Sequence, residues 1–242
     1  MIDIHAHILP GLDDGAASMD EALAMARKAA AENIHHIIAT PHCMDGVYNC
    51  TAPGILEACA RLNTALSVAG IPLTIHPGAE VRVTHDTLQA WDAGHLLSLG
   101  NTGTHILLEL PGMFITDGII RTIRQLSNRG LTTVLAHPER NPMIMHNPAI
   151  IREFVFEGAL VQITASSLIG DMGRGVRKTT EKLMDMDAVH FVASDIHPGR
   201  KYNMTRAAKK LTAETGNLAA REILTGPEII LVPPNCRTMG KN

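Results

Sequence analysis

A repeating pattern most constrains what this chain can fold into: a short apolar run ends at His, Glu or Asp, and a helix-like segment follows. Such runs end at His5, Glu109, His137 and Asp195. Most runs are continuous rather than alternating, which is typical of parallel strands that are buried on both faces. Strands that alternate with helices over 242 residues predict an α/β fold, either a barrel or an open doubly wound sheet.

Hydrophobic periodicity and turn residues place the expected elements along the chain. Strands are expected at residues 2–4, 36–39, 73–76, 106–108, 132–136, 160–164 and 190–193. Helices are expected at residues 18–33, 53–68, 84–92, 117–128, 148–156, 178–185, 203–215 and 218–224, followed by an irregular tail. We find no low-complexity linker and no repeat, so residues 1–242 are expected to form one domain.

The positions of the polar strand endings favour a barrel over an open sheet. An open sheet gathers its ligands at one crevice, where the strand order reverses. In this chain, polar residues end nearly every predicted strand in both halves of the sequence. That distribution fits the mouth of a closed barrel, where the carboxyl ends of all the strands meet.

Nine potential metal ligands lie at or just after these strand ends. Two of them, His5 and His7, are two residues apart in an extended segment, so their side chains point to one side. Nitrogen and oxygen ligands without cysteine suit Mn, Fe, Zn or Co better than a structural cysteine-rich zinc site. The full set is His5, His7, Asp14, His42, Glu80, Glu109, His137, Asp195 and His197.

Nine ligands exceed what one ion needs, and they would suffice for two or three ions, about 3.5–4 Å apart, with one carboxylate bridging. Each residue alone also has a structural interpretation. His42 follows Thr40-Pro41 and fits a turn, and Glu109 fits a solvated strand end. The metal hypothesis is favoured because all nine residues fall at one end of successive predicted strands.

Composition and charge exclude several other classes of protein. A formal charge of -3 and an aromatic share of 3% argue against nucleic-acid binding. The sequence shows neither a signal peptide nor an apolar run of membrane-spanning length, so we expect a cytoplasmic protein without membrane insertion. The four cysteines lack CxxC spacing and are expected to be free thiols. A cysteine-based phosphatase needs Arg six positions after its Cys, and no cysteine of this chain has one.

Several motifs resemble those of the polymerase and histidinol phosphatase (PHP) superfamily, in the same order and over about residues 1–230. Within that superfamily, the opening Ile-Asp-Ile-His-x-His-Ile-Leu-Pro-Gly-Leu-Asp-Asp-Gly is similar to the bacterial metal-dependent protein-tyrosine phosphatases of capsule and exopolysaccharide synthesis. The resemblance implies a distorted (β/α)7 barrel with a trinuclear centre, usually of manganese. The motifs are His5-Ala6-His7, Asp13-Asp14-Gly15, Thr40-Pro41-His42, Gly78-Ala79-Glu80, Ala136-His137-Pro138-Glu139-Arg140 and Ser194-Asp195-Ile196-His197.

The resemblance also implies a role for each site residue. Arg140 matches the family's phosphate-binding arginine, and Arg200 corresponds to a second one. A guanidinium fork can bind two oxygens of a phosphate at once, although Arg140 could instead pair with Glu139. The loop at 44–53 and the rim at 113–116 depart from the family pattern. The implied ligand sets are His5, His7, Glu80 and Asp195 for one ion; Glu80, Glu109 and His137 for a second; and Asp14, His42 and His197 for a third.

The implied activity is hydrolysis of protein phosphotyrosine, with the C-terminal tail of a bacterial tyrosine autokinase as the expected partner. A metal, or a protonated side chain such as His42, could assist the phenolate leaving group, whose parent pKa is about 10. Two alternatives stay open. One is another PHP phosphoesterase, such as a histidinol phosphatase, and the other is a catalytically silent metal-binding scaffold.

Overall fold

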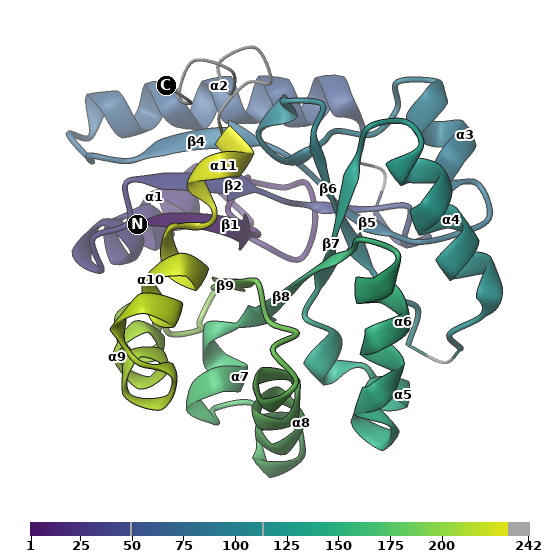
Figure 1. The fold of residues 1–242 in the computed structure, drawn as a ribbon. Coiled ribbons are helices and arrows are strands. Elements are labelled where there is room, and N and C mark those ends of the chain that lie inside the picture. Colours follow the sequence, from purple (N-terminus) through teal and green to yellow (C-terminus); the bar gives the residue numbers. More distant parts are fainter. Residues whose placement is uncertain (49, 113, 232–242) are drawn as a thin grey trace, which may run out of the picture.

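The computed structural model describes residues 1–48, 50–112 and 114–231, and in it parallel strands are surrounded by helices (Figure 1). The seven predicted strand regions are confirmed, and the hydrogen-bonded pairs of strands are all parallel. The strands are β1 Ile2–Ala6, β2 His36–Ala39, β3 His42–Cys43, β4 Thr74–Pro77, β5 Glu80–Arg82, β6 His105–Glu109, β7 Thr132–Ala136, β8 Leu160–Thr164 and β9 Phe191–Ala193.

Two of the predicted strands continue beyond a short break. After the break β2 is followed by β3, and β4 by β5, so one sheet has the order β1-β2-β4 and the other β3-β5-β6-β7-β8-β9. Pro41 lacks an amide hydrogen and interrupts the first of these strands. At the second break, a Cβ on Gly78 would lie 2.7 Å from the Cγ2 of Ile38, so only glycine fits this close approach.

The ring of strands is closed between its first and last members. Ala6 pairs in parallel with Ile196, just after β9. The amide of Asp195 donates to the carbonyl of His5 at 2.8 Å, and the amide of His7 donates to the carbonyl of Ile196 at 3.1 Å. The expected distorted (β/α)7 barrel is therefore confirmed, and the open doubly wound sheet is excluded.

The predicted helices are also confirmed, with shifts of a few residues at their ends. In the first of them, the N-cap Ser18 accepts from the amide of Glu21, and the Glu21 carboxylate accepts from the amide of Ala17, one residue before the N-cap position that a capping box would use. These helices are α1 Met19–Ala31, α2 Ala52–Val68, α3 Thr87–Asp92, α4 Asp117–Ser127, α6 Ile151–Phe156, α8 Arg174–Asp185, α9 Met204–Thr215 and α10 Asn217–Thr225.

The sequence did not predict several short elements. The prediction of an irregular tail after residue 224 is wrong for part of that segment, because α11 spans Glu228–Leu231. Residues 232–242 lie outside the described chain. The helix expected at 148–156 begins as a 3₁₀ turn, Pro148–Ile150. The remaining short elements are α5 Pro142–His146, α7 Ala165–Ile169 and the 3₁₀ turns Leu99–Asn101 and Pro138–Arg140.

The core has two parts, one inside the barrel and one between the strands and the surrounding helices. The inner cluster holds side chains that point inward from the strands, including Ile4, Ile38 and Leu107. Leu99 and Ile230 of α11 belong to the same buried cluster. Because apolar side chains fill the interior, the polar residues at the carboxyl ends of the strands form a site at the mouth rather than along a pore.

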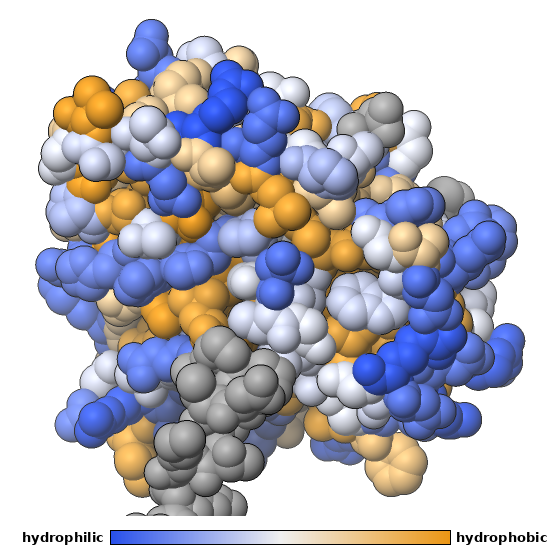
Figure 2. Space-filling view, turned by 90° about the horizontal axis from the view of Figure 1, so that it is seen from above, coloured by the Kyte–Doolittle hydropathy of each residue, from blue (hydrophilic) through white to orange (hydrophobic). Residues whose placement is uncertain are grey.

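Figure 2 looks down on the face that carries α2, at the top of Figure 1. Hydrophobic residues on this face are dispersed among hydrophilic ones and form no single broad patch.

Within residues 1–48, 50–112 and 114–231, no helix is both long and apolar enough to cross a membrane.

Candidate metal centre

The nine predicted ligands come together at the mouth of the barrel. β1, β3, β5 and β6 carry His5, His42, Glu80 and Glu109, and the other five residues follow β1, β7 or β9. Their ligand atoms form four overlapping groups, within each of which all the atoms lie within 4.8 Å of one another. The groups are His7, Asp14, His42 and His197; His5, His7 and Glu80; His5, His137 and Asp195; and His42, Glu80 and Glu109.

The most buried part of the centre has the spacing of a coordination sphere. The Nε2 atom of His5 lies 3.2 Å from Nε2 of His7, 3.4 Å from Oε2 of Glu80 and 3.3 Å from Oδ1 of Asp195. Ligands that bind one ion at about 2.1 Å are about 3.0–3.4 Å apart in octahedral or tetrahedral geometry. Oε2 of Glu80 is buried and makes no hydrogen bond of normal geometry among the described residues, although Nδ1 of His42 and Nε2 of His7 lie 3.0 and 3.3 Å away, so the site offers an unused ligand atom.

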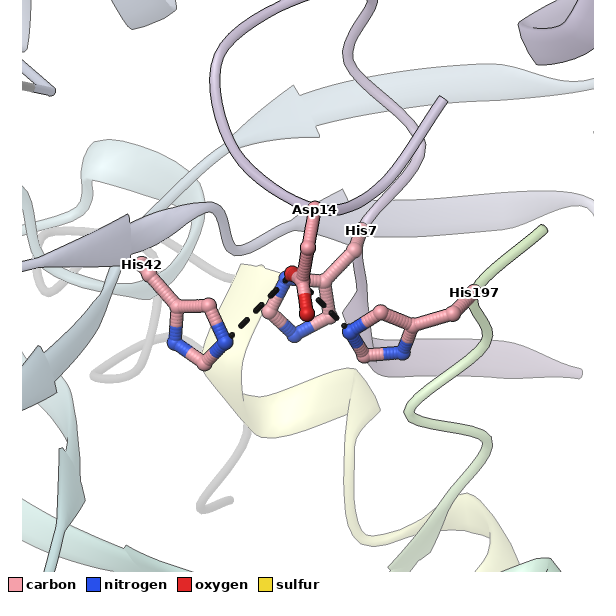
Figure 3. A group of neighbouring side chains, drawn as sticks. All are labelled: His7, Asp14, His42 and His197. Carbon is pink, nitrogen blue, oxygen red and sulfur yellow. Dashed lines mark ion pairs between the residues drawn. The ribbon is translucent and has the colours of Figure 1, made fainter. Parts of the chain in front are cut away.

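A second group lies nearer to solvent and is drawn in Figure 3. Asp14 lies between two histidine rings there, with Oδ1 at 3.2 Å from Nε2 of His197 and 3.6 Å from Nε2 of His42. The ring of His7 stacks on that of His197, with centroids 4.1 Å apart. His7 thus belongs to this group as well as to the buried one.

The resemblance assigned Glu80, Glu109 and His137 to one ion, but in the structure these three residues do not form one group of neighbouring ligand atoms. Nε2 of His137 lies 2.7 Å from Oε1 of Glu80, but His137 groups with His5 and Asp195, whereas Glu109 groups with His42 and Glu80. Glu109 also accepts a hydrogen bond at 2.6 Å from Nε of Arg82. Glu80 presents one oxygen to His5 and His7 and the other to His137, which is the arrangement expected of a bridging carboxylate.

The electrostatics of the centre depend on buried groups of opposite charge. Burial raises the pKa of Glu80, but His5 and His137 outweigh burial and hold this pKa well below its usual range. Burial lowers the pKa of His7, yet the neighbouring carboxylates of Asp13, Asp195 and Glu80 raise it well above its usual value. A proton on His7 therefore competes with a cation for this site, and affinity for the cation should fall as the pH is lowered.

Three residues to which sequence reasoning assigned no role hold the ligands in position. Nδ1 of His5 lies 2.8 Å from Oε1 of Gln162, and Nδ1 of His7 lies 2.6 Å from Oδ2 of Asp13. Such partners fix the orientation of a metal-binding imidazole. Asp3 is buried and accepts from the amide of Ser194 at 2.9 Å, which ties β1 to the segment that carries Asp195. Asp13 belongs to a recognised motif, but no local signal marks Gln162.

Both predicted arginines line a cavity of about 340 Å³ together with six of the nine potential ligands. Nη2 of Arg140 donates to Oδ2 of Asp195 at 2.5 Å, and Nη1 of Arg200 lies 3.6 Å from the same oxygen. The alternative partner of Arg140, Glu139, is itself buried and accepts from the amide of Thr164. Arg140 is therefore oriented from within the site. Arg82 adds a third guanidinium that the sequence did not indicate.

A closed parallel barrel whose mouth gathers nitrogen and oxygen ligands beside arginines defines a class of α/β barrel suited to metal-assisted chemistry on anions. Comparison with protein families matches residues 1–231 to the family described as "Capsular polysaccharide synthesis, CpsB/CapC". This chain belongs to that family.

Individual relatives agree with the family match. The tyrosine-protein phosphatase YwqE of Bacillus subtilis is 37% identical over 233 residues, which cover 96% of this chain and 91% of YwqE. A solved structure from a study of YwqE and of CpsB from Streptococcus pneumoniae, described as unique metal-dependent tyrosine phosphatases, matches with a TM-score of 0.91 and 36% identity; the match covers 96% of this chain and 94% of that one. The histidinol phosphate phosphatase of Lactococcus lactis shares only the fold, with 11% identity and a TM-score of 0.56 over 89% of this chain and 95% of that one.

Proposed function

We propose that this chain is a metal-dependent protein-tyrosine phosphatase that hydrolyses phosphotyrosine in proteins. The observation that carries this proposal is the clustering of nine potential ligands at the barrel mouth, six of which line one pocket together with Arg140 and Arg200. The relatives named as tyrosine-protein phosphatases support it, since the one in Bacillus subtilis is similar to almost the whole chain. A scaffold would have no need of such a pocket, and this argues against the catalytically silent alternative.

The ligand set fits two or three divalent ions, for which we propose manganese, with iron, cobalt or zinc as alternatives. We assign His5, His7, Asp14, His42, Glu80, Glu109, His137, Asp195 and His197 as the residues that hold them. When bound, such ions would polarise the phosphoryl group and activate a water molecule for attack on phosphorus.

The remaining side chains of the pocket would act on the phosphate and the leaving group. The guanidinium of Arg140, held by Asp195, would bind two oxygens of the phosphate dianion, and Arg200 would supply further positive charge at the more exposed edge. His42 faces the same pocket. Burial lowers the pKa of His42, but Glu80 outweighs burial and raises it. In a state in which His42 holds no ion, its protonated imidazole would assist departure of the tyrosine phenolate, and otherwise a metal ion would do so.

The family description supports a physiological setting in capsule or exopolysaccharide synthesis. We propose that the protein acts in the cytoplasm as a single domain, and that its substrate is the phosphorylated C-terminal tail of a tyrosine autokinase that controls this synthesis.

The proposal is tested by assaying the Mn²⁺-loaded protein on phosphotyrosine peptides and on histidinol phosphate. We expect a higher kcat/KM for the peptides. A clear preference for histidinol phosphate would favour the alternative that the protein is another PHP phosphoesterase, such as a histidinol phosphatase. Absence of turnover on both substrates and on p-nitrophenyl phosphate, with ions bound, would favour the scaffold.

Replacement of all four cysteines by serine is expected to leave the phosphatase activity within about twofold of wild type, because the proposed mechanism uses no thiolate. Cys43, Cys50 and Cys59 are free thiols, and Cys236 lies outside the described residues. Burial raises the pKa of Cys59 to about 12, and the pKa of Cys43 is raised by a hydrogen bond with Cys50, so neither is a ready nucleophile. Loss of turnover in a variant that keeps its circular dichroism spectrum would contradict the mechanism.

A further inference from the structure

A groove of about 480 Å³ lies on the outer side of the wall that bounds the catalytic pocket. The two cavities are lined by neighbouring residues of the same segments. Arg82 lines the catalytic pocket and Val83 the groove, and Gly112 and Pro111 are divided in the same way. The two cavities are therefore adjacent, with the end of β5 and the segment after β6 between them.

Hydrogen bonds hold this wall in place. The amide of Val83 donates to the carbonyl of Glu109 at 3.0 Å, which joins the end of β5 to the end of β6. The side-chain amide of Asn141, a residue of the catalytic pocket, donates to the carbonyl of Pro111 at 3.0 Å. A polypeptide whose phosphotyrosine occupies the pocket must leave it across the rim, and the groove lies beyond this wall.

The lining of the groove combines apolar surface with positive charge. Phe114 is 67% exposed and, with Ile119, gives the groove apolar surface that a bound side chain could cover. Arg121 also lines it, is exposed, and has no ion pair among the described residues. Thr116 and Gly118 bring the first turn of α4 to the groove, and Thr116 makes no side-chain cap there. Asp117 of that turn does not line the groove, so Arg121 is the charged group that an occupant would meet there.

We propose that this groove binds the polypeptide next to the phosphotyrosine of a protein substrate, and that it selects an extended segment carrying an acidic side chain. The proposal rests on the proposed phosphatase function and adds a sequence preference to it. Charge complementarity supports an acidic occupant, because Arg121 lines the groove without an ion pair and no Asp or Glu lines it within the described chain, whereas His85, which also lines it, pairs with Asp86. Phe114 would pack against the peptide beside that acidic residue.

The experiment compares four substrates and two charge reversals in the Mn²⁺-loaded protein. The substrates are p-nitrophenyl phosphate, free phosphotyrosine, and two phosphotyrosine peptides that differ only in Glu or Lys at the flanking positions. Arg121→Glu reverses the charge in the groove. Arg124→Glu is the matched control, because Arg124 lies on the same helix, pairs with Glu157 and does not line the groove.

Wild type is expected to prefer the Glu peptide over the Lys peptide. Arg121→Glu should lower kcat/KM for the Glu peptide about tenfold and change that for the two small substrates less than twofold, and Arg124→Glu should not alter the peptide preference. Phe114→Ala should lower kcat/KM for both peptides and leave kcat/KM for the two small substrates unchanged. Equal losses of kcat/KM for the Glu peptide in Arg121→Glu and Arg124→Glu would overturn the proposed role of the groove. Absence of a preference between the two peptides in wild type would also overturn it. A wild-type protein inactive on every phosphotyrosine substrate would overturn the proposed function, and the groove proposal with it.

Discussion

Replacing Glu80 by alanine is expected to lower kcat/KM by roughly 10³-fold or more, equivalent to about 4 kcal/mol of transition-state stabilisation. Glu80 is fully buried, and its two oxygens face different ligand groups, with Oε2 near His5 and His7 and Oε1 2.7 Å from His137. Loss of a carboxylate that binds two ions would disturb the binding of both.

The neighbouring carboxylate provides the comparison. Glu109 joins only one of the four ligand groups and is already paired with Arg82, so Glu109→Ala should cost less, about 10–100-fold. Steady-state assays on a phosphotyrosine peptide, together with circular dichroism to confirm folding, give the two values. Wild-type turnover by Glu80→Ala would show that Glu80 does not belong to the metal centre. A larger loss of kcat/KM in Glu109→Ala than in Glu80→Ala would assign the bridging role to Glu109.

Replacing Arg140 by alanine is expected to lower kcat/KM about 10²–10³-fold, roughly 3–4 kcal/mol, while the metal content is retained. Arg140 touches Oδ2 of Asp195, whereas Oδ1 faces His5 and His7, so loss of the guanidinium leaves the ligand oxygen in place. Arg140→Lys should recover only part of the loss, because an ammonium keeps the charge but not the two-pronged hydrogen bonding.

His137→Ala should fail in a different way. His137 belongs to a ligand group, so its loss should lower the metal content, and excess Mn²⁺ should restore part of the activity. Arg124→Ala serves as an arginine control, since Arg124 is exposed and does not line the catalytic pocket. If Arg140→Ala lost its ions, or turned over phosphotyrosine peptide like wild type, the phosphate-binding role would be wrong.

The sequence predicted most of the barrel because each strand and helix has a local hydrophobic pattern and local end signals. It missed β3 and β5, because the breaks at Pro41 and Gly78 resemble strand ends, and only pairing with neighbouring strands shows that the chain continues. α11 was missed for a related reason. Its four residues carry no helical period, and Ile230 is buried only because it joins the cluster inside the barrel.

The candidate ligands were predictable because parallel strands bring their carboxyl ends together, so residues at strand ends converge whatever their separation in sequence. The partners that orient those ligands were not predictable. Gln162 contacts His5 across 157 residues, and Asp3 contacts Ser194 across 191 residues. The grouping of Glu109 with His42 rather than His137 likewise depends on side-chain geometry that no motif records.

The metal content of the protein tests the central claim most directly. The protein would be stripped with EDTA, reconstituted with Mn²⁺, freed of excess metal and measured by elemental analysis beside a phosphotyrosine peptide assay. We predict two or three ions per chain, and full activity only at that stoichiometry, because the candidate ligands form four overlapping groups, three of which contain Glu80 or His7. Full activity with one ion per chain or fewer would contradict the multinuclear centre.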